Sequence, residues 1–215
     1  MTRRGILFSV FVLLTTTALL FGCSDTNVEE VDRGDAGATS EQPQMPDDEI
    51  HAGLTGATSS TAGITWTIPD AWNPGPERRM RVATYLIDEG VKEADCAVFY
   101  FGPNQGGSVE ANIERWIGQF EQPDDSDSHE KAQIEKKTVN GLDVTTIELG
   151  GTYNASMGGP MSGNKEKRPG WHMLGAIVEA PEGPVFFKVT GPQETVLEAT
   201  DEFDRMVGSV SVLGT

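Results

Sequence analysis

The dipeptide Asn140-Gly141 constrains the fold of this chain more than any other sequence feature. It joins two strand-like runs at 132–139 and 142–149, and it favours a tight turn because both turn residues need positive φ. A Pro-Glu-Gly-Pro sequence stands in the same way between runs at 173–179 and 185–190. Hairpins join antiparallel neighbours, so the sequence predicts an antiparallel sheet.

Three earlier runs, at 64–68, 80–87 and 94–101, complete the predicted strands. Two helices are also predicted, one capped by Ser108 and one opened by Gly191-Pro192. Their apolar residues recur at helical spacing and are Val109, Ile113, Trp116, Ile117 and Phe120 in the first helix, and Val196, Ala199, Phe203, Met206 and Val207 in the second. The predicted class is α+β, an antiparallel sheet of about six to seven strands packed by two amphipathic helices.

The start of the chain does not share this pattern. Residues 24–62 are acidic, poor in aliphatic side chains and rich in Gly, Ser, Thr, Ala and Asp. Such a composition buries too little apolar area to offset the entropy lost on ordering. We therefore predict an acidic flexible tether at 23–62 and one domain at 63–215.

Residues 1–22 predict a signal peptide, with Arg3-Arg4 before a short apolar run that ends at Leu20-Phe21-Gly22-Cys23. This arrangement resembles a bacterial lipoprotein signal. The resemblance implies that Cys23 is lipidated and anchors the protein to a membrane of the cell envelope. Ser24 after the cysteine resembles lipoproteins of the outer membrane, facing the periplasm, in a cell with two membranes. The alternative is an uncleaved transmembrane anchor.

Charge and cysteine content narrow the function further. The chain has 33 acidic and 16 basic residues, a net charge of −17, which opposes binding to nucleic acid. With Cys23 lipidated, Cys96 is the one remaining cysteine, so no intrachain disulfide is predicted. Because Cys96 stands in an apolar run, we expect it to be buried.

Catalytic motifs are not found in the sequence. There is no Gly-x-Ser-x-Gly elbow and no His-Glu-x-x-His pair, and cysteines with zinc-ligand spacing are missing. Asp124, Asp125 and Asp127 suggest a calcium loop, yet counting from Asp125 the glycine and glutamate of an EF-hand are replaced by Glu130 and Lys136. We expect a protein that is not an enzyme and carries no cofactor.

The most unusual part of the domain is 150–170, which holds six glycines and no periodicity. We predict a long loop there, either without a ligand or used to bind a partner protein. The candidate partner-binding residues are Trp72, Met157, Met161, Lys165, Lys167, Arg168 and Trp171. A third interpretation is a soft-metal site for Cu(I), for which thioether and imidazole groups are suitable ligands. Its weak candidates are Met157, Met161, His172 and Met173.

The opening Trp66-x-x-Pro69-x-x-Trp72, the order of elements and the closing helix resemble the PsbP-like group of α/β/α sandwiches over residues 62–212. The resemblance implies an accessory or assembly role rather than a catalytic centre, and it transfers no functional residue. The expected function is a lipid-anchored, non-enzymatic interaction module of the cell envelope, with an envelope protein as partner. The alternative is a protein that binds a small ligand or a soft metal through residues 150–173.

Overall fold

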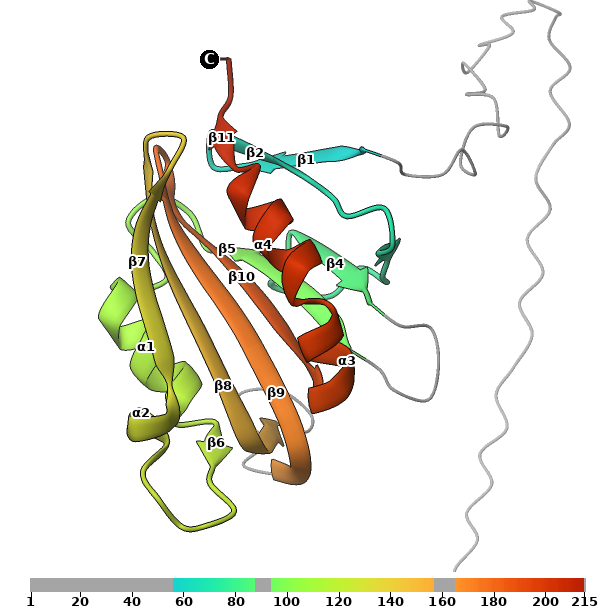
Figure 1. Ribbon diagram of the computed structural model, residues 1–215. Helices are drawn as coiled ribbons and strands as arrows, with labels where there is room; N and C mark the ends of the chain where they lie inside the picture. The colour runs from blue at the N-terminus through green and yellow to red at the C-terminus, as the bar shows by residue number, and fades with distance from the viewer. Residues whose placement is uncertain (1–55, 88–93, 157–164, 215) are drawn as a thin grey trace, which may run out of the picture. The chain divides into compact units, whose positions relative to one another are not determined.

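The computed structural model of the protein describes residues 56–87, 94–156 and 165–214, which form two antiparallel sheets and four helices (Figure 1). The strands are β1 (Thr58–Thr61), β2 (Ile64–Thr67), β3 (Asn73–Pro74), β4 (Ala83–Leu86), β5 (Asp95–Tyr100), β6 (Phe120–Glu121), β7 (Gln133–Val139), β8 (Leu142–Ser156), β9 (Lys165–Ala180), β10 (Gly183–Pro192) and β11 (Ser211–Val212). The helices are α1 (Val109–Ile117), α2 (Ser128–Lys131), α3 (Gln193–Glu198) and α4 (Thr200–Gly208). The predicted α+β class is confirmed.

Sheet order follows the predicted hairpins. The larger sheet runs β3-β4-β5-β10-β9-β8-β6, and the smaller sheet runs β1-β2-β11. Strand β7 pairs with the first half of β8, whereas β6 pairs with its second half. The turn between β7 and β8 has φ of 46° at Asn140 and 83° at Gly141, as the dipeptide predicts. The next hairpin, between β9 and β10, is closed by Pro181 and Glu182 alone.

Helices cover both faces of the larger sheet. Helix α1 lies against one face, and α3 and α4 lie against the other (Figure 1). Successive side chains of β10 point to opposite faces of the sheet, so this strand contributes to a core on each face. Phe186 packs with Trp116 of α1, whereas Phe187 packs with Trp66 in the core on the α4 side. Both phenylalanines and Trp66 are buried. Cys96 is fully buried in the core on the α4 side, as expected, and burial raises the pKa of its thiol far above its ordinary value.

The prediction of a long loop at 150–170 is wrong over the described residues. Strand β8 continues to Ser156 and β9 begins at Lys165, so most of this segment is paired backbone. Ladder hydrogen bonds need no side-chain alternation, which explains why a glycine-rich sequence without periodicity can still form strands. Residues 157–164, including Met157 and Met161, lie outside the described part of the chain.

An irregularity interrupts this long hairpin. Gly151 pairs with Trp171, but the next pair is Tyr153 with Arg168, so one residue of β8 faces two residues of β9. The two are Pro169 and Gly170, and Gly170 has a φ of 69°. A bulge accepts both residues, since proline cannot donate to the ladder and glycine tolerates positive φ.

The remaining differences concern element boundaries. Strand β1 lies inside the predicted tether and pairs with β2 through a turn at Ala62 and Gly63, which both have positive φ. The predicted closing helix is divided into α3 and α4 at Ala199. The run predicted to begin at residue 80 becomes a strand only at Ala83. No helix in the described ranges is long and apolar enough to cross a membrane.

Candidate functional site

Four of the predicted partner-binding residues lie together on the first part of β9. They are Lys165, Lys167, Arg168 and Trp171, and the strand β8 holds their backbone through ladder pairs from Ser156 to Gly151. Lys165 and Lys167 are exposed, whereas Arg168 and Trp171 are half-buried. The structure therefore gathers these residues on a paired strand rather than on a loop.

Arg168 and Trp171 are held by a stacked arrangement of rings. The Arg168 guanidinium lies 4.6 Å from the centroid of the Trp171 indole, within the range of a cation–π interaction. On β8, the Tyr153 ring is stacked on Trp171 with 5.6 Å between centroids and 10° between planes. The Phe120 ring also packs on Tyr153, with 5.2 Å between the ring centroids. The aromatic rings thus give Arg168 a defined position at the edge of the sheet.

A buried cation continues the same stack. The Lys188 ammonium of β10 lies 5.3 Å from the Tyr153 ring and 5.8 Å from the Trp116 ring, and it donates a hydrogen bond to Gln119 Oε1. Its side chain has lost nearly all contact with water. We call Arg168, Trp171, Tyr153, Lys188 and Trp116 the cation–aromatic stack. Two aromatic faces and one amide replace the water that an exposed ammonium would bind.

Burial has a large effect on the titration of Lys188. Loss of hydration lowers its pKa from 10.5 to about 7, and the positive charges of Arg81 and Arg115 act in the same direction. The carboxylate of Asp95 acts in the opposite direction, but it is already bound by Arg81 Nη1 at 2.5 Å. Near neutral pH, Lys188 is therefore divided between its charged and neutral forms.

Two glutamates neutralise much of the positive charge on β9. Glu121 of β6 binds Lys167 Nζ at 2.6 Å, and Glu166 binds Arg168 Nη2 at 2.8 Å. Hydrogen bonds to Lys167, and then to Asn154, hold the pKa of Glu121 below its usual range. The pairing keeps the charged groups in place but leaves Lys165 as the cation least engaged by described neighbours.

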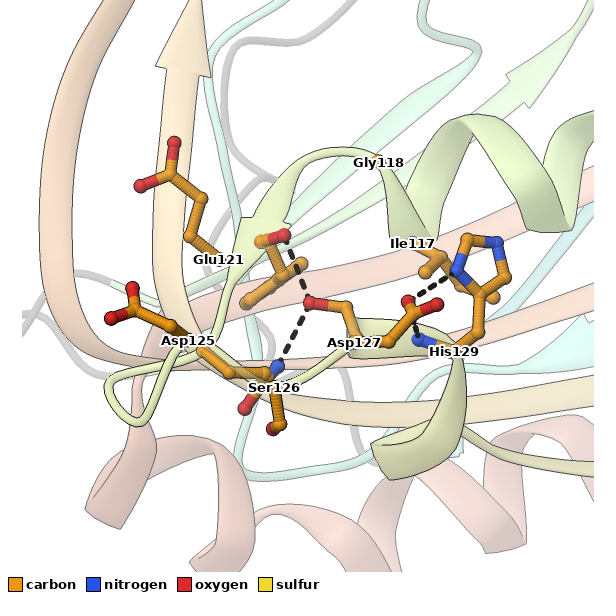
Figure 2. Close-up of a pocket in the computed structure, with 10 residues that line it drawn as sticks. Ile117, Gly118, Glu121, Asp125, Ser126, Asp127 and His129 are labelled. Atoms are coloured by element: carbon orange, nitrogen blue, oxygen red, sulfur yellow. Dashed lines mark hydrogen bonds and ion pairs between the residues drawn. The ribbon is translucent and has the colours of Figure 1, made fainter.

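A pocket of about 340 Å³ is lined by β6 and by residues 122–129, which follow it (Figure 2). Its His129 ring is bound at Nδ1 by Asp127, at 2.7 Å, and at Nε2 by Glu114, at 2.8 Å. These two carboxylates raise the pKa of His129, Glu114 first. The carboxylates of Glu121 and Asp125 point away from this pair (Figure 2).

The pocket does not assemble a reactive site. Ser128 Oγ is buried and donates to the Phe120 carbonyl at 3.0 Å, so this hydroxyl is not aimed at the imidazole. Asp127 caps α2 by accepting from the His129 backbone N–H at 2.9 Å. Across 56–87, 94–156 and 165–214, no three His, Cys, Asp or Glu side chains are grouped to hold a metal ion. Asp124 and Asp127 instead accept hydrogen bonds from the backbone of their own loop.

The prediction of Trp72 as a partner-binding residue does not agree with its position in the structure. Its indole is 2% exposed and packs 6.5 Å from the ring of Tyr85 in the core beneath α4. A turn in which the Trp72 N–H donates to the Pro69 carbonyl returns the chain to the sheet. Proline and glycine, which surround Trp72, are typical of a surface loop, but here they form a turn that inserts the ring into the core.

His172 and Met173 lie on opposite faces of β9. Met173 is fully buried on the α1 side, while His172 Nε2 binds Glu148 on the other side at 3.0 Å. One ion cannot contact both side chains. His172 Nδ1 is buried without a hydrogen-bond partner among the described residues. The other two candidate copper ligands, Met157 and Met161, lie outside the described residues, as does Cys23.

Sequence reasoning missed Tyr153, Lys188 and Gln119. One signal was available, since Lys188 interrupts an apolar run between Phe187 and Val189 in a predicted strand. A charged residue in such a run is seldom fully buried unless something compensates it. Tyr153 and Gln119 come from distant segments, so only the fold could bring them to Lys188.

No protein-family model matches the chain, and no curated protein matches its sequence. Among solved structures, cyanobacterial PsbP (CyanoP) from Synechocystis sp. PCC 6803 is 11% identical with a TM-score of 0.43, covering 72% of this chain and 89% of that one. A Bacteroides thetaiotaomicron protein is 8% identical with a TM-score of 0.37, covering 70% of this chain and 45% of its own.

Proposed function

We propose that the chain is a lipid-anchored, non-enzymatic accessory module of the cell envelope, which binds a partner protein through the start of β9. In this proposal Cys23 carries the lipid, and the membrane that holds it is the outer membrane if the cell has two. The lipoprotein-like sequence at residues 20–23 supports the anchor. The PsbP-like α/β/α sandwich that the sequence resembles also implies an accessory role.

The single observation that carries the partner-binding proposal is the stack of Arg168, Trp171 and Tyr153. An arginine at 4.6 Å from one ring, which itself stacks on a second, loses little further side-chain freedom on binding. Arginine, tryptophan and tyrosine are also the residues that contribute most often to binding energy at protein interfaces. A half-buried group of this composition, flanked by exposed Lys165 and Lys167, fits a protein partner better than a small ligand.

The alternative function, binding of a small ligand, has one observation in its favour. Lys188 is a buried cation whose pKa is lowered to about 7, and shifted ionisable groups are common at functional sites. A small anionic ligand seated against the stack would use this ammonium. The copper version of the alternative has less support, because His172 and Met173 face opposite sides of β9.

Site-specific photo-cross-linking in cells tests the proposal. A photo-reactive amino acid replaces Lys165 or Lys167, and in the control chain it replaces Lys136 on β7, which is equally exposed. We expect one envelope protein to be joined to positions 165 and 167 and not to 136. Trp171→Ala should remove the cross-linked product while the variant remains folded. The same products at all three positions would contradict the proposal.

A further inference from the structure

A second surface lies at the other edge of the larger sheet, between β1 and the segment that leads into β4. It is a groove of about 320 Å³. Its apolar walls include Ala57, Ile68, Pro76, Val82 and Tyr85. A hollow of this size is at the lower end of the range for binding pockets and can accept one large side chain.

The charged residues that line this groove are Glu77, Arg78 and Arg81, and Arg79 follows Arg78 in the sequence. Arg78 and Arg79 are both exposed, and neither guanidinium has an ion pair or hydrogen bond among the described residues. In contrast, the neighbouring Arg81 is held by Asp95 and lies over the Phe99 ring at 5.7 Å. Two adjacent unpaired arginines are unusual in a chain whose acidic residues outnumber its basic ones by 33 to 16. Their charge is available to a partner.

Apolar side chains are exposed beside the arginines. Met80 is 69% exposed and Val82 46%, which places both among the most exposed large apolar side chains of the described residues. Met80 also has a φ of 70°, a conformation that costs energy for any residue with a Cβ. A backbone hydrogen bond from the Arg81 N–H to the Arg78 carbonyl, at 3.2 Å, closes this turn. Strain of this kind is concentrated at functional segments.

We propose that the groove binds an extended acidic segment of a partner protein. Carboxylates of the segment pair with Arg78 and Arg79, and one of its apolar side chains enters the hollow beside Val82. Guanidinium groups recognise carboxylates through paired hydrogen bonds, so two unpaired arginines favour an acidic partner. This surface is separate from the one on β9, and the inference does not depend on the proposed function.

A peptide suits this surface better than an anionic membrane does. The net charge of −17 repels an extended anionic plane, whereas a single peptide strand contacts only the surface around Arg78 and Arg79. The hollow, which Pro76 and Tyr85 help to line, also has a volume that suits one side chain and not a layer of lipid headgroups. The two occupants can be separated by experiment.

The test uses the full chain in detergent and a short fluorescein-labelled peptide in which Glu and Leu alternate. Fluorescence anisotropy gives the Kd for the parent chain, for Arg78→Gln/Arg79→Gln, and for the control Lys136→Gln/Arg205→Gln. The control removes the same charge from two sites whose side chains are 70% and 69% exposed. We expect at least about tenfold weaker binding for the first variant and no change for the control. Val82→Asn should also weaken binding.

Specificity controls complete the test. A peptide with Gln in place of Glu should bind at least about tenfold more weakly to the parent chain. Equal loss of affinity in both charge variants would overturn the inference, since binding would then follow net charge alone. A preference for phosphatidylglycerol over phosphatidylcholine vesicles that disappears in Arg78→Gln/Arg79→Gln, without peptide binding, would identify a membrane as the occupant and would also overturn it.

Discussion

Gly175 of β9 lies directly beneath the indole of Trp116 in α1. A Cβ at position 175 would be 2.5 Å from the ring and 2.8 Å from Ile147 Cγ2, closer than real Cβ contacts allow. The missing side chain is therefore what allows α1 to approach the sheet. Through Trp116, the same close approach also sets one wall around Lys188.

Gly175→Ala should destabilise the protein by about 1–3 kcal/mol, because both the helix and Ile147 must move to accommodate the methyl group. Urea denaturation at neutral pH measures the change. Gly208→Ala is the matched control, since its Cβ would meet nothing within 4 Å and the residue closes α4. If the two substitutions have equal effects, the close packing of Gly175 against Trp116 is not what limits stability.

Stability should rise with pH through the range in which Lys188 loses its proton. The folded protein has a pKa of about 7 at this residue, whereas the unfolded chain keeps an ordinary lysine pKa near 10.4. Between these values the unfolded state binds more protons, so the free energy of unfolding increases with pH, by at most about 1.4 kcal/mol per unit. Below pH 7 both states are charged and this contribution is constant.

The variant Lys188→Met/Gln119→Leu should lack this part of the pH dependence and should be more stable than the parent at pH 7. Replacing Gln119 as well avoids leaving its half-buried amide without a partner. Denaturation of both proteins at pH 7, 8 and 9 provides the comparison. Parallel curves would show that Lys188 titrates normally in the folded protein.

Asn140 has two separable roles in its hairpin. Its φ of 46° favours asparagine or glycine, and its Nδ2 donates to the Val210 carbonyl at 2.8 Å, just before β11. Asn140→Gly keeps the turn and removes the hydrogen bond, so we expect a loss of about 1 kcal/mol. Asn140→Ala should lower the free energy of unfolding by about 1–2 kcal/mol more, because alanine must also adopt an unfavourable positive φ. Thermal denaturation of the two variants separates these terms, and equal melting temperatures would exclude a backbone contribution.

Cys23→Ser should release the protein from membranes if Cys23 is the lipidated residue. Membrane fractions and the mass of the N-terminal peptide give the result, with Cys96→Ser as a thiol control. Continued tight association of the Cys23→Ser chain would instead support an uncleaved membrane anchor at the N-terminus.

Local sequence signals predicted those elements whose cause is local. Asn140-Gly141 predicted its hairpin because the turn conformation depends on those two residues, and the apolar spacing from Val109 to Ile117 predicted α1. Ser108 caps that helix as expected, its Oγ accepting from the Ala111 N–H at 3.2 Å.

Local sequence signals did not predict the features that depend on distant parts of the chain. The strand pairing of residues 150–156 comes from β9, and no pattern within a glycine-rich segment reveals its partner. The turn residues around Trp72 favour a place at the surface, although a turn can direct a large ring inward, as it does here. Of the candidate site, Arg168 and Trp171 were found from sequence, but their support by Tyr153 required the bulge.

The bulge at Pro169 and Gly170 decides which side of the sheet carries the arginine. In a regular strand, residues three apart such as Arg168 and Trp171 would point to opposite faces. The extra residue restores Arg168 to the face of Trp171. Deleting Gly170 alone would turn the bulge into regular pairing and would leave Arg168 two residues from Trp171, still on the same face. The pairing of two residues against one is thus what keeps the arginine and the indole together, and one-to-one pairing that kept both Pro169 and Gly170 would place them on opposite sides of the sheet.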